Sequence, residues 1–260
     1  MNRQLKIAII LMIIGGLLTT LAFFMAFYTA RVQGFGHISF DAPIRTAFNE
    51  IIPTPENVAQ FGIPEDGFSY EVPWFSQKIF YFHVPVAEAS FLVFTVAAIF
   101  AVLFLMRKEK RSDTRSRIAM ETAFIFVVLT MITGVLWTRA SWGVWWDWEP
   151  RLTTYFIMMI LMIAYFVVRN SVPDEERAAI YAAVFCIIAW VDAPLSVLIT
   201  RLIPSNHPVV FQSGMDTTNL IPFIIAQIGM LMIGYAIYTL RAGEEDLRER
   251  IDILKERLED

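Results

Sequence analysis

The chain has 260 residues, of which 57% are hydrophobic and 18% are charged, and its mean hydropathy is +0.55. A soluble domain has about 45–50% apolar and about 25% charged residues, so this composition excludes an ordinary soluble domain and predicts an integral membrane protein. The single cysteine, Cys186, excludes an intramolecular disulfide and a CxxC thiol-exchange pair. Its place inside an apolar run indicates a small, buried apolar residue.

Six apolar runs divide the chain. A helix that crosses the hydrocarbon core needs about 20 mostly apolar residues, and each of the six approaches or exceeds that length. The first run is longer than the hydrophobic region of a signal peptide, so we interpret it as an anchor. We therefore predict an all-α six-transmembrane-helix bundle. The spans are residues 7–28, 84–106, 119–137, 152–168, 178–200 and 220–240.

Basic residues gather in alternate connecting segments. The segment RKEKRSDTRSR after the second span holds six of them, and the N-terminus and the segment after the fourth span add more. By the positive-inside bias, both termini are predicted to be cytoplasmic. The outer face then receives three segments, residues 31–83, 138–151 and 201–219. The first is long and contains five prolines, which favours a small ordered cap or a loop with little regular structure.

The C-terminal tail differs from the membrane domain, which we assign to residues 1–240. Residues 241–260 are charged, with Leu247, Ile251, Leu254 and Leu258 spaced 4, 3 and 4 apart. That spacing predicts a cytoplasmic amphipathic helix with one apolar stripe. The stripe suits a short coiled coil or a partner groove, or a solvated helix that rests on its neighbours.

The segment SWGVWWDWEPRLT, residues 141–153, is the densest chemical signal. Four of the chain's seven tryptophans lie within seven of its residues. A plain aromatic belt at the membrane interface is one interpretation, but a belt distributes its tryptophans over many helix ends. Because each indole can bury roughly 150–250 Å², four together favour a platform for a flat ligand, with Asp147, Glu149 and Arg151 as polar groups. The tryptophans are Trp142, Trp145, Trp146 and Trp148.

Three histidines exist, and all fall in segments assigned to the outer side. His83 lies in KIFYFHVP, where the chain enters the second span, and His207 lies in PSNHP between spans five and six. Histidines from two sides are a common way to hold haem iron, other transition metals also take imidazole, and an interfacial histidine is often simply a satisfied polar group. His37 is interpreted as a loop residue. Glu88 lies about one turn inside span two from His83 and either orients a neighbouring group or stays hydrated.

The motif WGVWWDWEPRLT resembles the tryptophan-rich WWD signature of the haem-handling superfamily of cytochrome c biogenesis (CcmC, CcmF and CcsA). Within that superfamily the chain is most similar to the CcmC-type family. The resemblance extends over most of the chain, because an HVP motif opens span two and the signature lies between spans three and four. A histidine between spans five and six agrees with it.

The resemblance implies a haem-handling membrane domain over residues 1–240. Such proteins bind non-covalent haem b at the outer, periplasmic face of the bacterial inner membrane and deliver it to a membrane-anchored haem chaperone (CcmE-type), without acting as enzymes. An ABC-type release complex (CcmAB-type) and a small single-span subunit (CcmD-type) are further implied partners. His83 and His207 would be the axial ligands, and Arg151 could pair with a haem propionate. The implied platform comprises Trp142, Gly143, Trp145, Trp146, Trp148 and Glu149.

Two positions depart from the CcmC-type signature. Glu149 stands where the signature usually has aspartate, and Pro150 is shared with the synthase-type and lyase-type branches. The alternative function is therefore a subunit of a cytochrome c haem lyase or synthase (CcsA-type) that attaches haem to apocytochrome c. A transporter or permease subunit is less favoured, because transporters carry polar residues or broken helices near the midplane. A haem- or quinone-based electron-transfer subunit would place its histidines inside the bundle.

Overall fold

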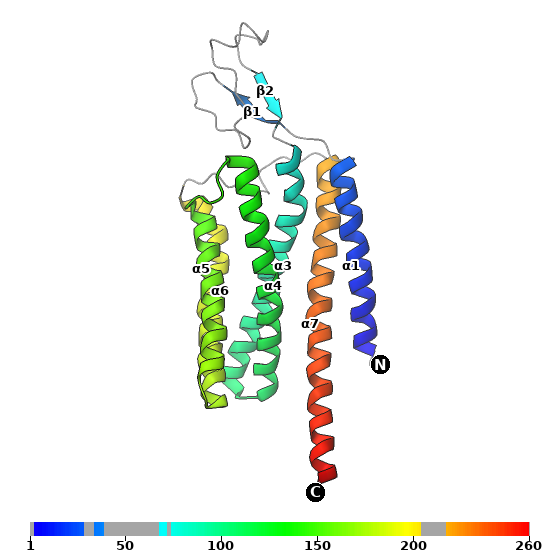
Figure 1. Ribbon diagram of the computed structural model, residues 1–260, viewed down its shortest axis with the longest axis vertical. Coiled ribbons are helices and arrows are strands. Elements are labelled where there is room, and N and C mark those ends of the chain that lie inside the picture. The colour runs from blue at the N-terminus through cyan, green and yellow to red at the C-terminus, as the bar shows by residue number, and fades with distance from the viewer. Residues whose placement is uncertain (1–2, 29–33, 39–67, 72–73, 204–216, 260) are drawn as a thin grey trace.

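A computed structural model describes residues 3–28, 34–38, 68–71, 74–203 and 217–259 of the chain (Figure 1). Six helices in this part are long and apolar enough to cross a membrane, so the six-span prediction is confirmed. The elements are α1 (Arg3–Tyr28), β1 (Gly34–Ile38), β2 (Phe68–Glu71), α3 (Trp74–Arg107), α4 (Lys110–Trp142), α5 (Pro150–Ser171), α6 (Glu175–Leu202) and α7 (Thr217–Glu259).

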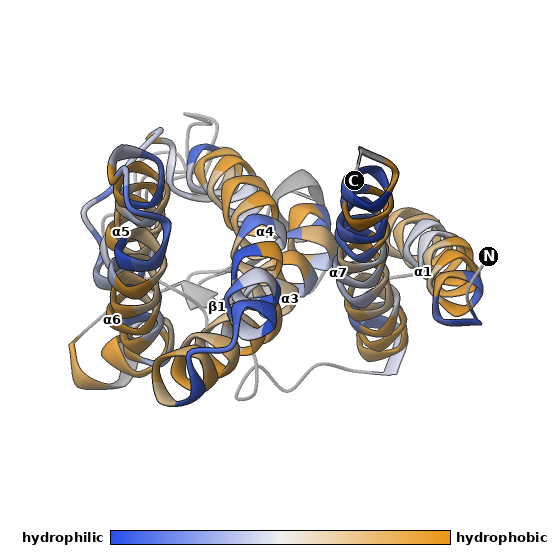
Figure 2. Ribbon diagram, turned by 90° about the horizontal axis from the view of Figure 1, so that it is seen from below, coloured by the Kyte–Doolittle hydropathy of each residue, from blue (hydrophilic) through white to orange (hydrophobic). Residues whose placement is uncertain are grey.

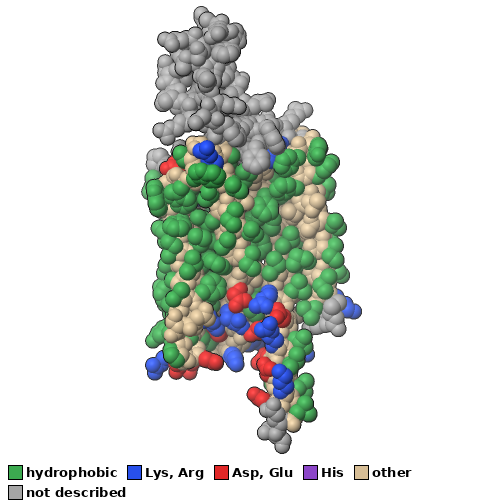
Figure 3. All heavy atoms as spheres, in the orientation of Figure 1, with side chains coloured by type: hydrophobic (Ala, Val, Ile, Leu, Met, Phe, Trp, Pro, Cys, Tyr) green, Lys and Arg blue, Asp and Glu red, His purple; other side chains and the backbone are tan. Residues whose placement is uncertain are grey.

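Successive helices run in opposite directions, so both chain ends lie at the same end of the bundle (Figure 1). Charged side chains also gather at that end, whereas the flanks of the bundle are covered by apolar side chains (Figure 3). This distribution is the one that a bilayer requires, because apolar side chains face lipid and charges face water. The cytoplasmic assignment of this end stays a prediction.

The first outer segment contains a short antiparallel pair of strands. β1 and β2 pair Gly34 with Glu71, His37 with Ser69 and Ile38 with Phe68, with an irregularity between the first two pairs. His37 therefore belongs to a strand, and the interpretation of it as a loop residue was wrong. The sequence GFGHI opposite FSYE supplies aromatic and branched residues that favour paired extended backbone.

The helices pack as three pairs, α3 with α4, α5 with α6 and α1 with α7, and the α3–α4 pair lies between the other two (Figure 2). Small residues allow the close approach of α1 and α7. A Cβ atom added to Gly229 would lie 2.6 Å from Thr19 Oγ1 and 2.9 Å from the Gly15 carbonyl oxygen, so only glycine fits there. The buried residues of α1 form one stripe: Ala8, Gly15, Ala22 and Ala26.

The main core lies among α3, α4, α5 and α6. Phe94, Met120, Met158 and Met162 are buried there. Cys186 is buried and free in the same cluster, which confirms its prediction as a small apolar residue. The core is built from sulfur-containing, aromatic and alanine side chains, and the alanines let the helix backbones approach closely.

Two boundaries differ from the sequence prediction. α3 begins at Trp74, ten residues before the expected start of span two, so His83 lies within the helix and not at its entrance. Pro85 did not end the helix, because the preceding aromatic residues bury against α4 and α7. The sixth span and the tail form one continuous helix, α7, of 43 residues.

Candidate functional site

His83 is held by α4 through a hydrogen bond to its imidazole ring. The imidazole is 7% exposed, and its Nδ1 lies 2.9 Å from Thr133 Oγ1. The Thr133 hydroxyl also lies 2.8 Å from the Leu129 carbonyl oxygen, to which it can donate. Because a hydroxyl has one proton, both hydrogen bonds form together only when His83 Nδ1 carries a proton. A histidine with an anchored Nδ1–H is the form that binds a metal through Nε2.

Two more residues on the same face of α4 shape the surroundings of His83. A Cβ atom on Gly134 would lie only 3.1 Å from His83 Cε1, so glycine makes room for the imidazole. The ring of Trp137 contacts His83 edge-on, with centroids 5.4 Å apart. Sequence reasoning missed Thr133, Gly134 and Trp137. Their spacing of one and three residues places them on one helical face, but the sequence alone does not show that this face meets His83.

The tryptophan segment begins where α4 ends. Gly143 terminates α4 with φ 74°, a left-handed conformation that glycine adopts without steric cost, and its N–H donates to the Arg139 carbonyl oxygen at 3.2 Å. The Arg139 guanidinium donates in turn to the Gly143 carbonyl oxygen and lies 5.5 Å from the centroid of the Trp145 ring. Gly143 thus reverses the chain, and Arg139 supports the segment that follows.

The tryptophans divide into exposed and supporting members. Trp145 and Trp148 are 60% and 70% exposed. Trp146 is half-buried, with its ring 5.6 Å from that of Trp148 and 5.5 Å from that of Phe156 on α5. Among the described residues the buried indole N–H of Trp146 finds no acceptor. Trp142 is the last residue of α4 and is also half-buried. The segment therefore offers two exposed indoles on a base formed by a third.

The polar residues after the tryptophans lie at the start of α5. Glu149 is 5% exposed, and its side chain caps the helix by accepting from the Leu152 N–H at 3.0 Å. Pro150 fits the first helical turn, where no backbone N–H is needed. Arg151 lies half-buried within electrostatic reach of the Glu149 and Glu88 carboxylates. Glu88 and Arg151 thus interact electrostatically, which agrees with the orienting role considered for Glu88.

The start of α7 is tied to α3 close to His83. Tyr81 donates a hydrogen bond to Asn219 Oδ1 at 3.1 Å, and the rings of Phe80 and Phe223 stack with centroids 5.1 Å apart. His207 lies outside the described residues, ten positions before the first residue of α7. The structure thus places His83, Trp142, Gly143, Trp145, Trp146, Trp148, Glu149 and Arg151 on α3, α4, α5 and the turn between α4 and α5, all towards one end of the bundle (Figure 1).

Comparison with known proteins matches the chain to one family. The profile of the family described as heme exporter protein C (CcmC) matches residues 73–257. Heme exporter protein C of Bradyrhizobium diazoefficiens is 27% identical over 183 residues, which cover 68% of this chain and 70% of that protein. The protein of the same name from Rhodobacter capsulatus is 28% identical over 119 residues, or 46% of this chain and 49% of the relative.

A plant protein extends the similarity to mitochondria. A ccmC-like mitochondrial protein of cytochrome c biosynthesis from Marchantia polymorpha is 31% identical over 118 residues, or 45% of this chain and 49% of that protein. The chain thus spans about half the length of the Rhodobacter and Marchantia relatives.

The capping role of Glu149 gives a direct test of how the tryptophan segment is held. Glu149→Ala should destabilise the first turn of α5 by about 1 kcal/mol, because the Leu152 N–H loses its acceptor. Hydrogen exchange should then become faster at the amides of residues 151–153. Asp147→Ala is the matched control, since Asp147 is an acid of the same turn that does not form the cap. Equal exchange in both variants would contradict the capping role.

Proposed function

Since this chain belongs to the heme exporter protein C family, we propose that it binds haem at the outer membrane surface and hands it on for cytochrome c assembly. His83 is the observation that carries the proposal. It is buried on α3, its Nδ1 is hydrogen-bonded to Thr133 of α4, and its ring packs edge-on against Trp137, so its imidazole is held in one orientation at the end of the bundle that carries the tryptophan segment.

The exposed indoles of Trp145 and Trp148 supply the surface for the porphyrin. Both side chains are more than half exposed and adjoin one another in a single turn, where an aromatic belt would distribute them over several helix ends. The edge-on contact of Trp148 with Trp146 and the contact of Trp146 with Phe156 hold the group on α5. A flat macrocycle is the kind of ligand that covers two exposed indoles at once. These contacts support a stacked haem that remains accessible from outside.

His207 is proposed as the second axial ligand. It lies five residues after the end of α6 in the sequence. At about 3.3 Å per residue, an extended chain of that length limits how far His207 can lie from the end of the helix. His83 lies on α3 and contacts Thr133 and Trp137 of α4, and these contacts oppose its displacement. In this proposal, release begins when a ligand of the acceptor replaces His207, while His83 stays in place.

A spectroscopic test follows from the ligand assignment. The full chain in detergent should take up haem and show a Soret band with resolved α and β bands after reduction. His83→Ala and His207→Ala should each lose the spectrum of two histidine ligands, because one axial position is vacated. His37→Ala is the control, because it changes the third histidine of the chain, which lies in β1. Unchanged haem binding in the double variant His83→Ala, His207→Ala would remove the ligand assignment.

The hydrogen bond to Thr133 predicts a finer effect on the same site. Thr133→Val removes the acceptor for His83 Nδ1–H and should weaken haem binding about 10–100-fold, the usual cost of losing a partner that orients a metal ligand. The reduction potential of the bound iron should shift as well. Thr133→Ser keeps the hydroxyl and should behave like the unchanged chain. Titration with haem and a potentiometric titration measure the two effects, and a Val variant equal to the Ser variant would contradict the role of this bond.

Hand-off is tested with the CcmE-type chaperone that the sequence resemblance implies. The haem-loaded chain should lose its Soret band as the apo-chaperone gains one. The double variant Trp145→Ala, Trp148→Ala should hold less haem and transfer less, with little change in thermal stability, because both indoles are largely exposed before haem binds. Haem that becomes covalently attached to an apocytochrome without any chaperone would instead support the synthase-subunit function.

A further inference from the structure

The C-terminal part of α7 extends past the rest of the bundle. α7 has 43 residues, and at about 1.5 Å per residue it is about 65 Å long. The hydrocarbon core of a bilayer is only about 30 Å thick. α7 continues straight beyond the ends of the neighbouring helices, and charged side chains gather around its emerging part (Figures 1 and 3). The final turns of the helix therefore project away from the membrane along the direction of the span.

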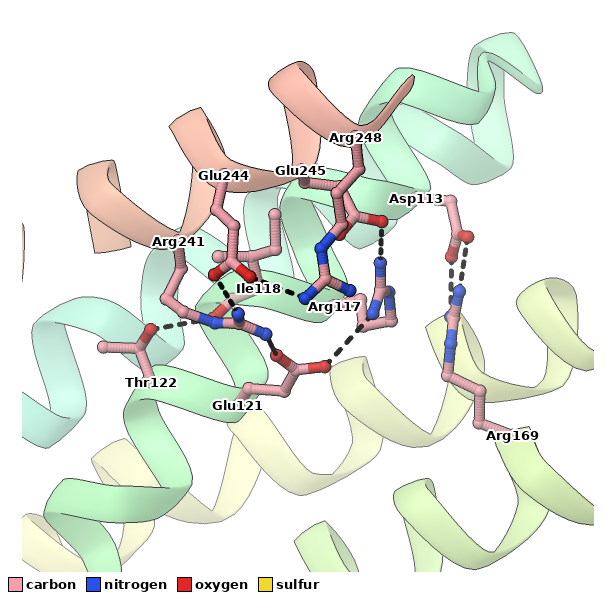
Figure 4. Close-up of polar contacts among 10 residues, drawn as sticks. All are labelled: Asp113, Arg117, Ile118, Glu121, Thr122, Arg169, Arg241, Glu244, Glu245 and Arg248. Carbon is pink, nitrogen blue, oxygen red and sulfur yellow. Dashed lines mark hydrogen bonds and ion pairs between the residues drawn. The ribbon is translucent and has the colours of Figure 1, made fainter. Parts of the chain in front are cut away.

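Ion pairs with α4 fix the rotation of this projecting helix. Arg115 forms a bidentate pair with Asp246 at 2.7 and 2.8 Å, and Arg117 contacts Glu245 at 2.5 Å. One turn earlier, Arg241 pairs with Glu121 of α4 at 3.2 Å (Figure 4). Because Glu245 and Asp246 face α4, the side of α7 that they occupy is turned towards the bundle. The opposite side is turned towards solvent.

An apolar seam occupies the solvent side. Leu247, Ile251, Leu254 and Leu258 are 57%, 42%, 58% and 86% exposed. At 100° per residue they fall within a sector of about 60°. In heptad terms they are alternating d and a positions, the positions that a partner helix covers in a coiled coil. We define these four residues as the tail seam.

Both borders of the tail seam are basic. Arg248 and Lys255 occupy the e positions on one side, and Arg250 and Arg257 occupy the g positions on the other. Arg248 pairs within the helix with Glu244 at 2.6 Å, and Lys255 lies 3.7 Å from Asp252. These pairs are solvent-exposed and therefore easily exchanged for a partner's carboxylates. Most acidic residues of the tail lie away from the seam: Glu245, Asp246, Glu249, Asp252 and Glu256.

The charge pattern selects among possible occupants of the seam. In a parallel pair of two copies, g positions face e positions, and in an antiparallel pair e faces e and g faces g. Each arrangement would oppose basic residues to basic residues, so a second copy is disfavoured. A membrane surface attracts basic amphipathic helices that lie flat on it, but α7 continues away from the membrane. An amphipathic helix with acidic e and g positions satisfies both the apolar seam and its basic borders.

We propose that the tail seam is a docking site for an acidic amphipathic helix of a partner protein on the side of the membrane that carries both termini. The ion pairs to α4 hold the seam at a fixed angle, so a docked helix is held in register with the membrane bundle. The proposal does not depend on haem binding, because the seam lies at the end of the bundle opposite the tryptophan segment (Figure 1).

Binding of designed peptides to the full chain tests the chemistry of the site. The chain is placed in nanodiscs of zwitterionic lipid and titrated with labelled three-heptad peptides that carry Leu and Ile at a and d. The peptide with Glu at e and g should bind, and the peptide with Lys there should not. Leu254→Asp should weaken binding at least about tenfold, a change of about 1.4 kcal/mol. Ile253→Asp is the matched control, since Ile253 is 43% exposed but lies outside the seam.

Reversing the charge of the seam borders, and testing for self-association and lipid protection, distinguishes the proposed partner helix from a second copy and from a lipid surface. Replacing Arg248, Arg250, Lys255 and Arg257 with Glu should reverse the preference, so that the basic peptide binds and the acidic peptide does not. Equal binding of both peptides, or equal weakening by Leu254→Asp and Ile253→Asp, would overturn the proposal. Self-association that Leu254→Asp abolishes would indicate a second copy, and protection of the tail only in nanodiscs with anionic phosphatidylglycerol would indicate a lipid surface. Either result would also overturn it.

Photo-crosslinking in cells identifies the natural occupant. A photoreactive amino acid at position 254 should crosslink to a polypeptide, whereas the same group at position 253 should give little product. Mass spectrometry of the crosslinked peptide should show apolar residues at heptad spacing with acidic borders. A crosslinked segment without that pattern, or crosslinks to the tail of another copy or to lipid, would contradict the proposed partner.

Discussion

The fold depends on the polar contacts that α3 makes with four of its neighbours. A polar side chain in a membrane span has no water to satisfy it, so it must find a partner on an adjacent helix. α3 does so through His83 to α4, Ser90 to Tyr155 of α5, Thr95 to Trp190 of α6, and Tyr81 to Asn219 of α7. Each bond is modest in energy, and lipid offers no hydrophobic driving force between helices. Their importance is geometric: they fix how α3 is rotated against these four helices.

The same contacts between helices also fix the orientation of the buried His83 side chain. His83 is held from one side by Thr133 and Trp137, and it lies one helical turn or less from Tyr81 and Phe80, which contact α7. A side chain whose rotamer is set by several helices loses little further entropy when it binds a ligand. The tryptophan segment is different, since it lies on a turn and exposes two indoles. The proposed site therefore combines a fixed histidine on a helix with two exposed indoles on a turn, an arrangement that suits the binding and later release of haem proposed above.

The sequence predicted the six spans and the tryptophan segment because both depend on composition over a short window. It misplaced the start of α3, since Pro85 and the polar residues before it suggest a boundary, whereas burial of Phe80 and Tyr81 against α7 extends the helix towards the outer face. It could not identify Trp137 or Thr133 as neighbours of His83, because contact between two helices depends on their relative rotation. Glu149 shows a further limit of prediction from sequence. Its place in the motif suggested that it belongs to a ligand platform, and the structure shows that its side chain also caps α5. The proposed role of Glu149 towards haem stays a prediction.

The two ends of the bundle use different chemistry because their surroundings differ. Where charges meet water, the cost of removing them from solvent is small, and arginine–carboxylate pairs such as those of Arg115 and Arg169 can link α4 to α7 and to α5. Towards the end that carries the tryptophan segment the helices are joined by aromatic contacts and neutral hydrogen bonds, which remain favourable beside lipid. α7 takes part in both sets, through Asn219 and Phe223 at one end and Asp246 at the other. Because it is one continuous helix, its position beside α3 at the end that carries the tryptophan segment and the direction of the tail seam are fixed together. A partner that docks on the seam would therefore meet the membrane bundle in a defined orientation.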